Sequence, residues 1–394
     1  GQVYPGQMDS TFVPVRSHHY DPELTFDFCV NEPAWSNQAG IHSAFGSTDR
    51  LYFRKEVPVN HDNDLSSSYS TTVWRGERAN AQILVWSSEA LEQVRVSTQD
   101  LRSAEGNIIP KDRITFELVR YVLSNYPYAE KKAICGESPY KSGFLMPDRF
   151  ETLDRFDLPS QTTRPVWMMV DVPRGTVPGT YKGQVEVRAK GKAPQLLNLE
   201  IVVQNQLLPY PKDWKYRLDL WQNPWAVAWY NHVEPWSPEH KMLLKQHLKH
   251  YADAGGTYIT TYGVHSPWSD NSYMIEGGMI EWIKKADGTW AFDYKIFDEY
   301  VELAMECGID EAITLYTPIP WGFRHRYKDE ATGDYSYINW APSSEEFKKM
   351  WNIFLTDFKF HLEAKSWLDI TYIGINENPM AETLAAINVV RNHD

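Results

Sequence analysis

The first half of the chain alternates apolar and polar positions with a period of two, which is typical of half-buried β-strands. Turn signals such as Val177-Pro178-Gly179-Thr180 separate these short runs. The runs lie at residues 71–78, 81–86, 93–97, 165–172, 181–187 and 197–203. Residues 1–208 are therefore predicted to form an all-β, N-terminal β-sandwich domain.

The pattern changes after Gln206-Leu207-Leu208-Pro209-Tyr210-Pro211, where two prolines disfavour both a helix and a central strand. We therefore expect a domain boundary between residues 208 and 209. Beyond it, short apolar runs alternate with segments of helical periodicity. Strands are expected at 216–221, 258–262, 312–316 and 370–375, helices at 238–254, 294–307, 343–364 and 380–390, and a long loop at 317–342.

Repeated strand–helix units predict parallel strands joined by right-handed crossovers. A complete (β/α)8 barrel needs about 250 residues, so residues 209–394 are predicted to be a (β/α)8-barrel catalytic domain of which about the first four βα units are present. An open, doubly wound sheet is the alternative. The long loops after the strands and the lack of a dinucleotide-binding glycine pattern favour the barrel.

Composition narrows the class of ligand. The net charge of −13 argues against a nucleic-acid partner, because a phosphate backbone attracts clustered Lys and Arg. The 16 Trp and 23 Tyr suit a carbohydrate ligand, because aromatic faces pack on the apolar faces of sugars. No apolar run is long enough for membrane insertion. The three cysteines and the His18-His19 pair show no metal-ligand spacing, so neither a metal nor another cofactor is expected.

The first residue, Gly1, indicates a trimmed N-terminus, from which we expect a secreted, periplasmic or cell-surface bacterial protein.

The candidate site residues follow the expected strands, because active sites of such barrels lie at the C-terminal strand ends. They are Trp221 and Asn223 after the first strand, Tyr262, His265 and Trp268 after the second, Tyr316 and Trp321 after the third, and Asn376 and Glu377 after the fourth. The aromatic side chains could line a sugar platform or could simply pack in the core. His265 could bind a sugar hydroxyl or could be structural.

Glu377 is the sharpest catalytic candidate, since it ends an apolar strand and precedes Asn378-Pro379. Desolvation among aromatic rings would raise the pKa of its carboxyl group, as a general acid requires. The alternative is a glutamate that stabilises a helix N-terminus. The preceding Asn376 has two interpretations. It belongs to an Asn-Glu acid/base motif whose partner nucleophile lies on a later strand, or it stands where an aspartate once acted with Glu377.

Five segments resemble glycoside hydrolase family 123, the β-N-acetylgalactosaminidases. They are residues 73–78, 177–183, 219–224, 317–321 and 373–377. The resemblance implies removal of terminal N-acetylgalactosamine (GalNAc) from glycans or glycosphingolipids, by retaining catalysis in which the sugar's own acetamido group forms an oxazoline. Glu377 matches the family's acid/base. Asn376 stands where the family has an aspartate that orients and stabilises the acetamido group.

The amide of Asn376 cannot carry the negative charge of that aspartate. We therefore expect reduced turnover with substrate binding largely kept. Two other hypotheses remain open from the sequence. One is a retaining glycosidase that uses Asn376-Glu377 as its acid/base motif with a nucleophile in the missing half of the barrel. The other is a non-catalytic carbohydrate-binding protein.

Overall fold

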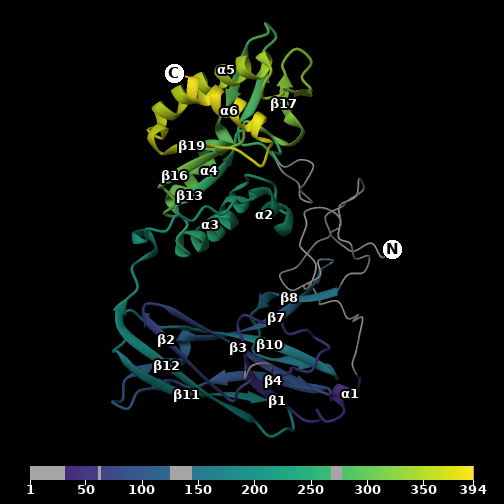
Figure 1. Ribbon diagram of the computed structural model, residues 1–394, viewed down its shortest axis with the longest axis vertical. Helices are drawn as coiled ribbons and strands as arrows, with labels where there is room; N and C mark the ends of the chain where they lie inside the picture. Colours follow the sequence, from purple (N-terminus) through teal and green to yellow (C-terminus); the bar gives the residue numbers. More distant parts are fainter. Residues whose placement is uncertain (1–31, 61–63, 125–143, 268–276, 394) are drawn as a thin grey trace. The chain divides into compact units, whose positions relative to one another are not determined.

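The computed structural model describes residues 32–60, 64–124, 144–267 and 277–393. The chain is β-rich, with several sheets and some helices (Figure 1). It divides into two compact units, and within the described residues the division falls between Leu208 and Pro209.

The N-terminal unit contains two sheets. The five-stranded sheet has the order β1 (His42–Gly46), β3 (Arg78–Ser87), β10 (Thr162–Asp171), β7 (Ile114–Ser124) and β8 (Phe144–Glu151). The seven-stranded sheet runs β2 (Ser68–Arg75), β12 (Gln195–Leu207), β11 (Gly179–Arg188), β4 (Leu91–Thr98) and β9 (Phe156–Leu158). Beside this path, β5 (Leu101–Arg102) pairs with β11, and β6 (Ile108–Ile109) pairs with β5. Short helices lie at α1 (Glu32–Trp35) and η1 (Lys111–Arg113).

One hydrophobic core serves both sheets of this unit. Ile83 and Val166 come from the five-stranded sheet, and Val185 and Ile201 come from the seven-stranded sheet. All four are at most 2% exposed. Alternate positions of each strand therefore face a common interior, which is the physical basis of the two-residue period in the sequence.

The second unit is built on a three-stranded parallel sheet with the order β13 (Tyr258–Tyr262), β16 (Ala312–Tyr316) and β19 (Thr371–Gly374) (Figure 1). The long helices are α3 (Pro238–Asp253), α4 (Lys295–Glu306), α5 (Glu345–Lys365) and α6 (Met380–Asn392). Short ones are α2 (Pro224–Asn231), η2 (Pro211–Asp213), η3 (Trp321–Phe323) and η4 (Leu368–Ile370).

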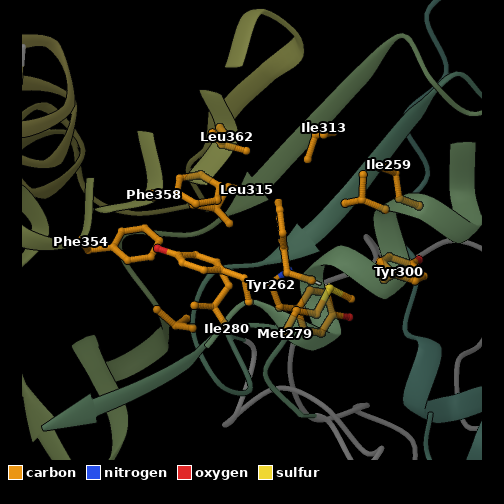
Figure 2. Close-up of a cluster of buried hydrophobic side chains, with 14 of the residues drawn as sticks. Ile259, Tyr262, Met279, Ile280, Tyr300, Ile313, Leu315, Phe354, Phe358 and Leu362 are labelled. Atoms are coloured by element: carbon orange, nitrogen blue, oxygen red, sulfur yellow. Dashed lines mark hydrogen bonds between the residues drawn. The ribbon is translucent and has the colours of Figure 1, made fainter. Parts of the chain in front are cut away.

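Helices α4 and α5 pack on the sheet through a buried cluster. Figure 2 shows Ile259 and Leu315 from the strands together with Tyr300 of α4 and Phe358 and Leu362 of α5. These side chains are buried, so the strands lie against the helices on this face of the sheet.

The strand expected at 216–221 is not formed, since this segment makes only an isolated bridge between Leu218 and Gly256. The hydroxyl of Tyr251 is the reason. Its Oη lies 2.7 Å from Leu218 O and accepts from Leu220 N at 3.1 Å, so it takes the place of ladder bonds. A Cβ at Gly256 would lie 2.2 Å from the Tyr251 ring, so only glycine leaves room for this arrangement.

The prediction of a long loop at 317–342 is also wrong. It contains the hairpin β17 (Arg324–Asp329) and β18 (Tyr335–Asn339), which joins β14 (Glu281–Lys284) and β15 (Trp290–Asp293) in a four-stranded sheet. The sequence of β17 is mostly polar because only one of its faces meets the core: His325 is 2% exposed, whereas Arg324 is exposed. Because of this polar composition, the strand has no apolar run from which it could be predicted.

Candidate active site

Parallel register brings the three strand ends to one edge of the sheet. Tyr262 pairs with Tyr316, and Tyr316 pairs with Gly374. Asn376 follows Gly374 by two residues. The predicted site residues of these strands therefore start from the same edge.

Asp219 connects the segment at 218–223 to the sheet. Its Oδ1 accepts a hydrogen bond from Thr260 Oγ1 at 2.9 Å, and its Oδ2 accepts one from Thr314 Oγ1 at 3.3 Å. Thr260 and Thr314 are paired in register, so one carboxylate spans β13 and β16. Sequence reasoning gave Asp219 no role. Two signals could have found it: Asp219 begins the family-like segment 219–224, and it precedes the candidate residue Trp221 by two positions.

Trp221 presents an aromatic surface at the strand ends. Its ring centroid lies 4.9 Å from that of Tyr316, with an angle of 44° between the planes. Tyr316 is buried, whereas Trp221 is 56% exposed. The buried ring thus supports an exposed indole that a sugar could contact.

Tyr262 and Asn223 instead hold the scaffold together. Tyr262 is fully buried, donates from Oη to Gln222 O at 2.8 Å and stacks on Trp225. Asn223 is the N-cap of α2, where its Oδ1 accepts from Ala226 N at 3.2 Å. Both side chains position the segment that carries Trp221.

His265 and Trp321 come from neighbouring loops. Trp321 N donates to Pro267 O at 3.2 Å, which joins the loop after β16 to the loop after β13. Burial, with smaller contributions from the charges of Arg326 and Arg324, lowers the pKa of His265 to about 4. Its imidazole is therefore neutral near pH 7 and can both donate to and accept from a hydroxyl. Trp268 and the His18-His19 pair lie outside the described residues.

Asn376 and Glu377 occupy different environments at the end of β19. Asn376 is 8% exposed, and its Oδ1 accepts a hydrogen bond from Asn378 Nδ2. Glu377 is exposed and lies three residues before the start of α6. The expectation that aromatic rings enclose Glu377 is therefore wrong for the part of the chain that the structure describes.

The described residues contain neither a cluster of metal-ligating side chains nor a helix that could span a membrane. No group of three or more His, Cys, Asp and Glu side chains in the described ranges could hold a metal ion. None of the helices there is both long and apolar enough to span a bilayer.

Comparison with known proteins assigns the family. Residues 45–189 match the N-terminal domain of glycoside hydrolase family 123, and residues 221–394 match its catalytic domain. The chain belongs to glycoside hydrolase family 123. The resemblance seen in the sequence is thereby confirmed.

A solved family 123 glycoside hydrolase from Clostridium perfringens, from a study of glycolipid glycan hydrolysis, is 27% identical with a TM-score of 0.80. The match covers 90% of this chain and 61% of that chain, so the present chain spans about three fifths of the length of that family 123 enzyme. No curated protein matches the chain.

Two other solved structures are far less similar to this family 123 chain. A human PapD-like domain is 12% identical, with a TM-score of 0.22 over 47% of this chain and 99% of that chain. A Bacteroides ovatus GH5 xyloglucanase is 11% identical, with a TM-score of 0.20 over 83% of this chain and 61% of that chain. Neither carries an argument about function.

Proposed function

We propose that this family 123 protein removes terminal β-linked GalNAc from glycans or glycolipids. The observation that carries the proposal is the Asn376-Glu377 pair at the end of β19, at the same sheet edge as Tyr316 and its partner Trp221. The family match and the similarity to the Clostridium perfringens enzyme support it. In this proposal the three parallel strands belong to a (β/α)8 barrel, and the N-terminal unit is a β-sandwich.

The proposed reaction proceeds with retention through the substrate's acetamido group. Glu377 donates its proton to the glycosidic oxygen while the acetamido oxygen attacks the anomeric carbon. The bond to the leaving group breaks and an oxazolinium ring forms. Water then attacks the anomeric carbon and gives a proton to Glu377, which restores the acid and the acetamido group. The exposure of Glu377 allows this proton to exchange with solvent.

Asn376 has one free acceptor position in this scheme. Asn378 Nδ2 already donates to Asn376 Oδ1, and a carbonyl oxygen can accept two hydrogen bonds. The second position can receive the acetamido N–H. A carboxylate would offer one oxygen to Asn378 and the other to the acetamido group, and would also offset the positive charge of the oxazolinium. The amide supplies the hydrogen bond without the charge, so binding should survive better than turnover.

The test is Asn376→Asp in the full-length protein that carries this chain, assayed with a chromogenic β-N-acetylgalactosaminide. We expect kcat to rise by about 100-fold or more, the usual order for one electrostatic group in a transition state, with a small change in KM. Asn352→Asp, on the exposed side of α5, is the matched control and should change neither value. Equal rates for the unsubstituted protein and the Asn376→Asp variant would show that this residue does not stabilise the oxazolinium.

Two further measurements separate the remaining hypotheses. Cleavage of a β-galactoside that lacks the acetamido group, by both forms at similar rates, would favour a separate nucleophile elsewhere in the protein. Sugar binding by both forms without turnover would favour a carbohydrate-binding protein, for which the exposed Trp221 is the supporting observation.

A further inference from the structure

The hairpin β17–β18 has one buried and one cationic face. His325 and Tyr327 pack toward the core, so the intervening Arg324, Arg326 and Lys328 share the opposite face. Their register partners are Asn339, Tyr337 and Tyr335, respectively. Three cations of β17 thus lie beside two tyrosines of β18.

Both arginines of this face lie over aromatic rings. Arg324 Cζ is 3.8 Å from the centroid of Tyr337, and Arg326 Cζ is 4.2 Å from that of Tyr335. Such cation–π contacts hold a guanidinium in a defined orientation. Its N–H groups can still donate in the plane of the guanidinium, where a carboxylate or a sulfate can accept two hydrogen bonds.

Arg324 has no ion-pair partner among the residues that the structure describes. Arg326 Nη2 lies 3.7 Å from Glu281 Oε1, and Tyr335 Oη donates to the other oxygen of Glu281 at 3.0 Å. Arg324 is exposed, and no carboxylate forms an ion pair with it within the described ranges. A guanidinium held over a tyrosine ring, with no carboxylate partner among the described residues, is a local exception in a chain of net charge −13.

Arg324 also lies close to the strand-end site. It follows the η3 turn that begins at Trp321, and Trp321 N is bonded to Pro267 O in the loop that carries His265. Burial and, to a smaller degree, the positive charges of Arg326 and Arg324 lower the pKa of His265. Trp321 is 37% exposed and precedes the exposed Arg324 by three residues in the chain.

We propose that Arg324 and Trp321 form a subsite for an acidic sugar of the substrate glycan, with Trp321 contacting the sugar ring and Arg324 binding a carboxylate or a sulfate ester. This proposal rests on the proposed glycan-directed function and specifies its substrate class. Neutral His265 can hydrogen-bond a hydroxyl of the same sugar without adding a third positive charge.

The test measures binding by calorimetry in the full-length protein with Asn376 retained, so that turnover does not interfere. The probes are a neutral GalNAc-terminated oligosaccharide, the same oligosaccharide with a sialic acid branch, the methyl ester of that sialylated form, and a sulfated form. We expect at least one acidic probe to bind about tenfold more tightly than the neutral probes. The preference should shrink as salt is raised, because the contact is exposed.

Substitutions at Arg324 test whether this residue causes the preference for acidic probes. Arg324→Ala should abolish it and leave the affinity for the neutral oligosaccharide unchanged, whereas Arg324→Lys should retain part of it as a point charge. Arg391→Ala, an exposed arginine of α6, is the control and should keep the full preference. A preference for the sialylated probe alone would identify a carboxylate as the ligand, and one for the sulfated probe alone would identify a sulfate.

The results that would contradict the proposed subsite differ from those that would contradict the proposed function. Equal binding of acidic and neutral probes by the native protein, or an unchanged preference in Arg324→Ala, would overturn the subsite while the proposed function stands. Failure to bind any GalNAc-terminated probe would overturn the proposed function itself.

Discussion

The ring of Trp221 lies 4.9 Å from the ring of Tyr316, which joins an irregular segment to the end of a central strand. The two residues differ in environment, because Tyr316 is 2% and Trp221 is 56% exposed. This contact therefore holds an otherwise solvent-facing indole in place at the strand ends.

Trp221→Ala should weaken substrate binding far more than folding. We expect KM for a β-N-acetylgalactosaminide to rise by about tenfold, which corresponds to a loss of about 1.4 kcal/mol. The free energy of unfolding should change by less than about 1 kcal/mol, since the ring is mostly exposed. Steady-state kinetics of the Asn376→Asp form and urea denaturation measure the two quantities. Tyr216→Ala, which removes a 67% exposed ring five residues earlier in the chain, should change neither, and a similar rise in KM there would contradict the assignment.

Tyr251→Phe should destabilise the second unit. The hydroxyl of Tyr251 lies 2.7 Å from Leu218 O and 2.9 Å from Tyr258 O, and it accepts from Leu220 N. Its removal leaves these backbone groups without their partner, at a cost of about 1–3 kcal/mol. Urea denaturation gives the free energy of unfolding. Tyr216→Phe is the control, and an equal effect of the two substitutions would rule out the bridging role.

His325 should make the stability of the fold depend on pH. Burial lowers the pKa of His325 to about 4, against the opposing effect of hydrogen bonds to Phe323 and Pro318 carbonyl groups. Its Nε2 accepts from Trp351 Nε1 at 3.2 Å, which requires the neutral ring. The unfolded chain binds this proton near pH 6.5, whereas the folded chain binds it only near pH 4. Stability from this group is thus complete above pH 6.5 and is lost as pH falls toward 4.

The size of the effect follows from linkage. The difference between the unfolded and folded pKa values of His325 changes the free energy of unfolding by about 3 kcal/mol, since each pKa unit corresponds to about 1.4 kcal/mol. Denaturation at pH 7, 6, 5 and 4 should show a shallower loss of stability in His325→Gln than in the unsubstituted protein. His250→Gln, at an exposed position of α3, should keep the full slope. Identical slopes for all three proteins would mean that His325 does not resist protonation in the folded state.

Periodicity predicted the regular elements that meet the core on one face. The expected strands at 258–262 and 312–316 coincide with β13 and β16, and the expected helix at 238–254 differs from α3 by one residue at its end. Ser237 is the N-cap of α3, and its side chain accepts from His240 N. These features depend on residues close together in the chain.

The hairpin β17–β18 escaped sequence analysis because charged and aromatic side chains, several of them exposed, make up most of its two strands. Its two faces become distinct only when β14 and β17 pair in parallel. The site was only partly predictable for the same reason. Strand-end position pointed to Trp221 and Asn376, but it did not distinguish an exposed Trp221 from a buried Tyr262.

The sequence by itself determined the family, the alternating strands of the N-terminal unit and the strand–helix units from residue 258 onward, because these follow from motifs and from the periods of local structure. Only the tertiary structure decided that Asp219 joins Thr260 to Thr314, that Tyr251 replaces ladder bonds, and that Glu377 is exposed. These depend on side chains that are distant in the sequence and meet only when the sheet assembles. No local pattern of residues encodes such contacts.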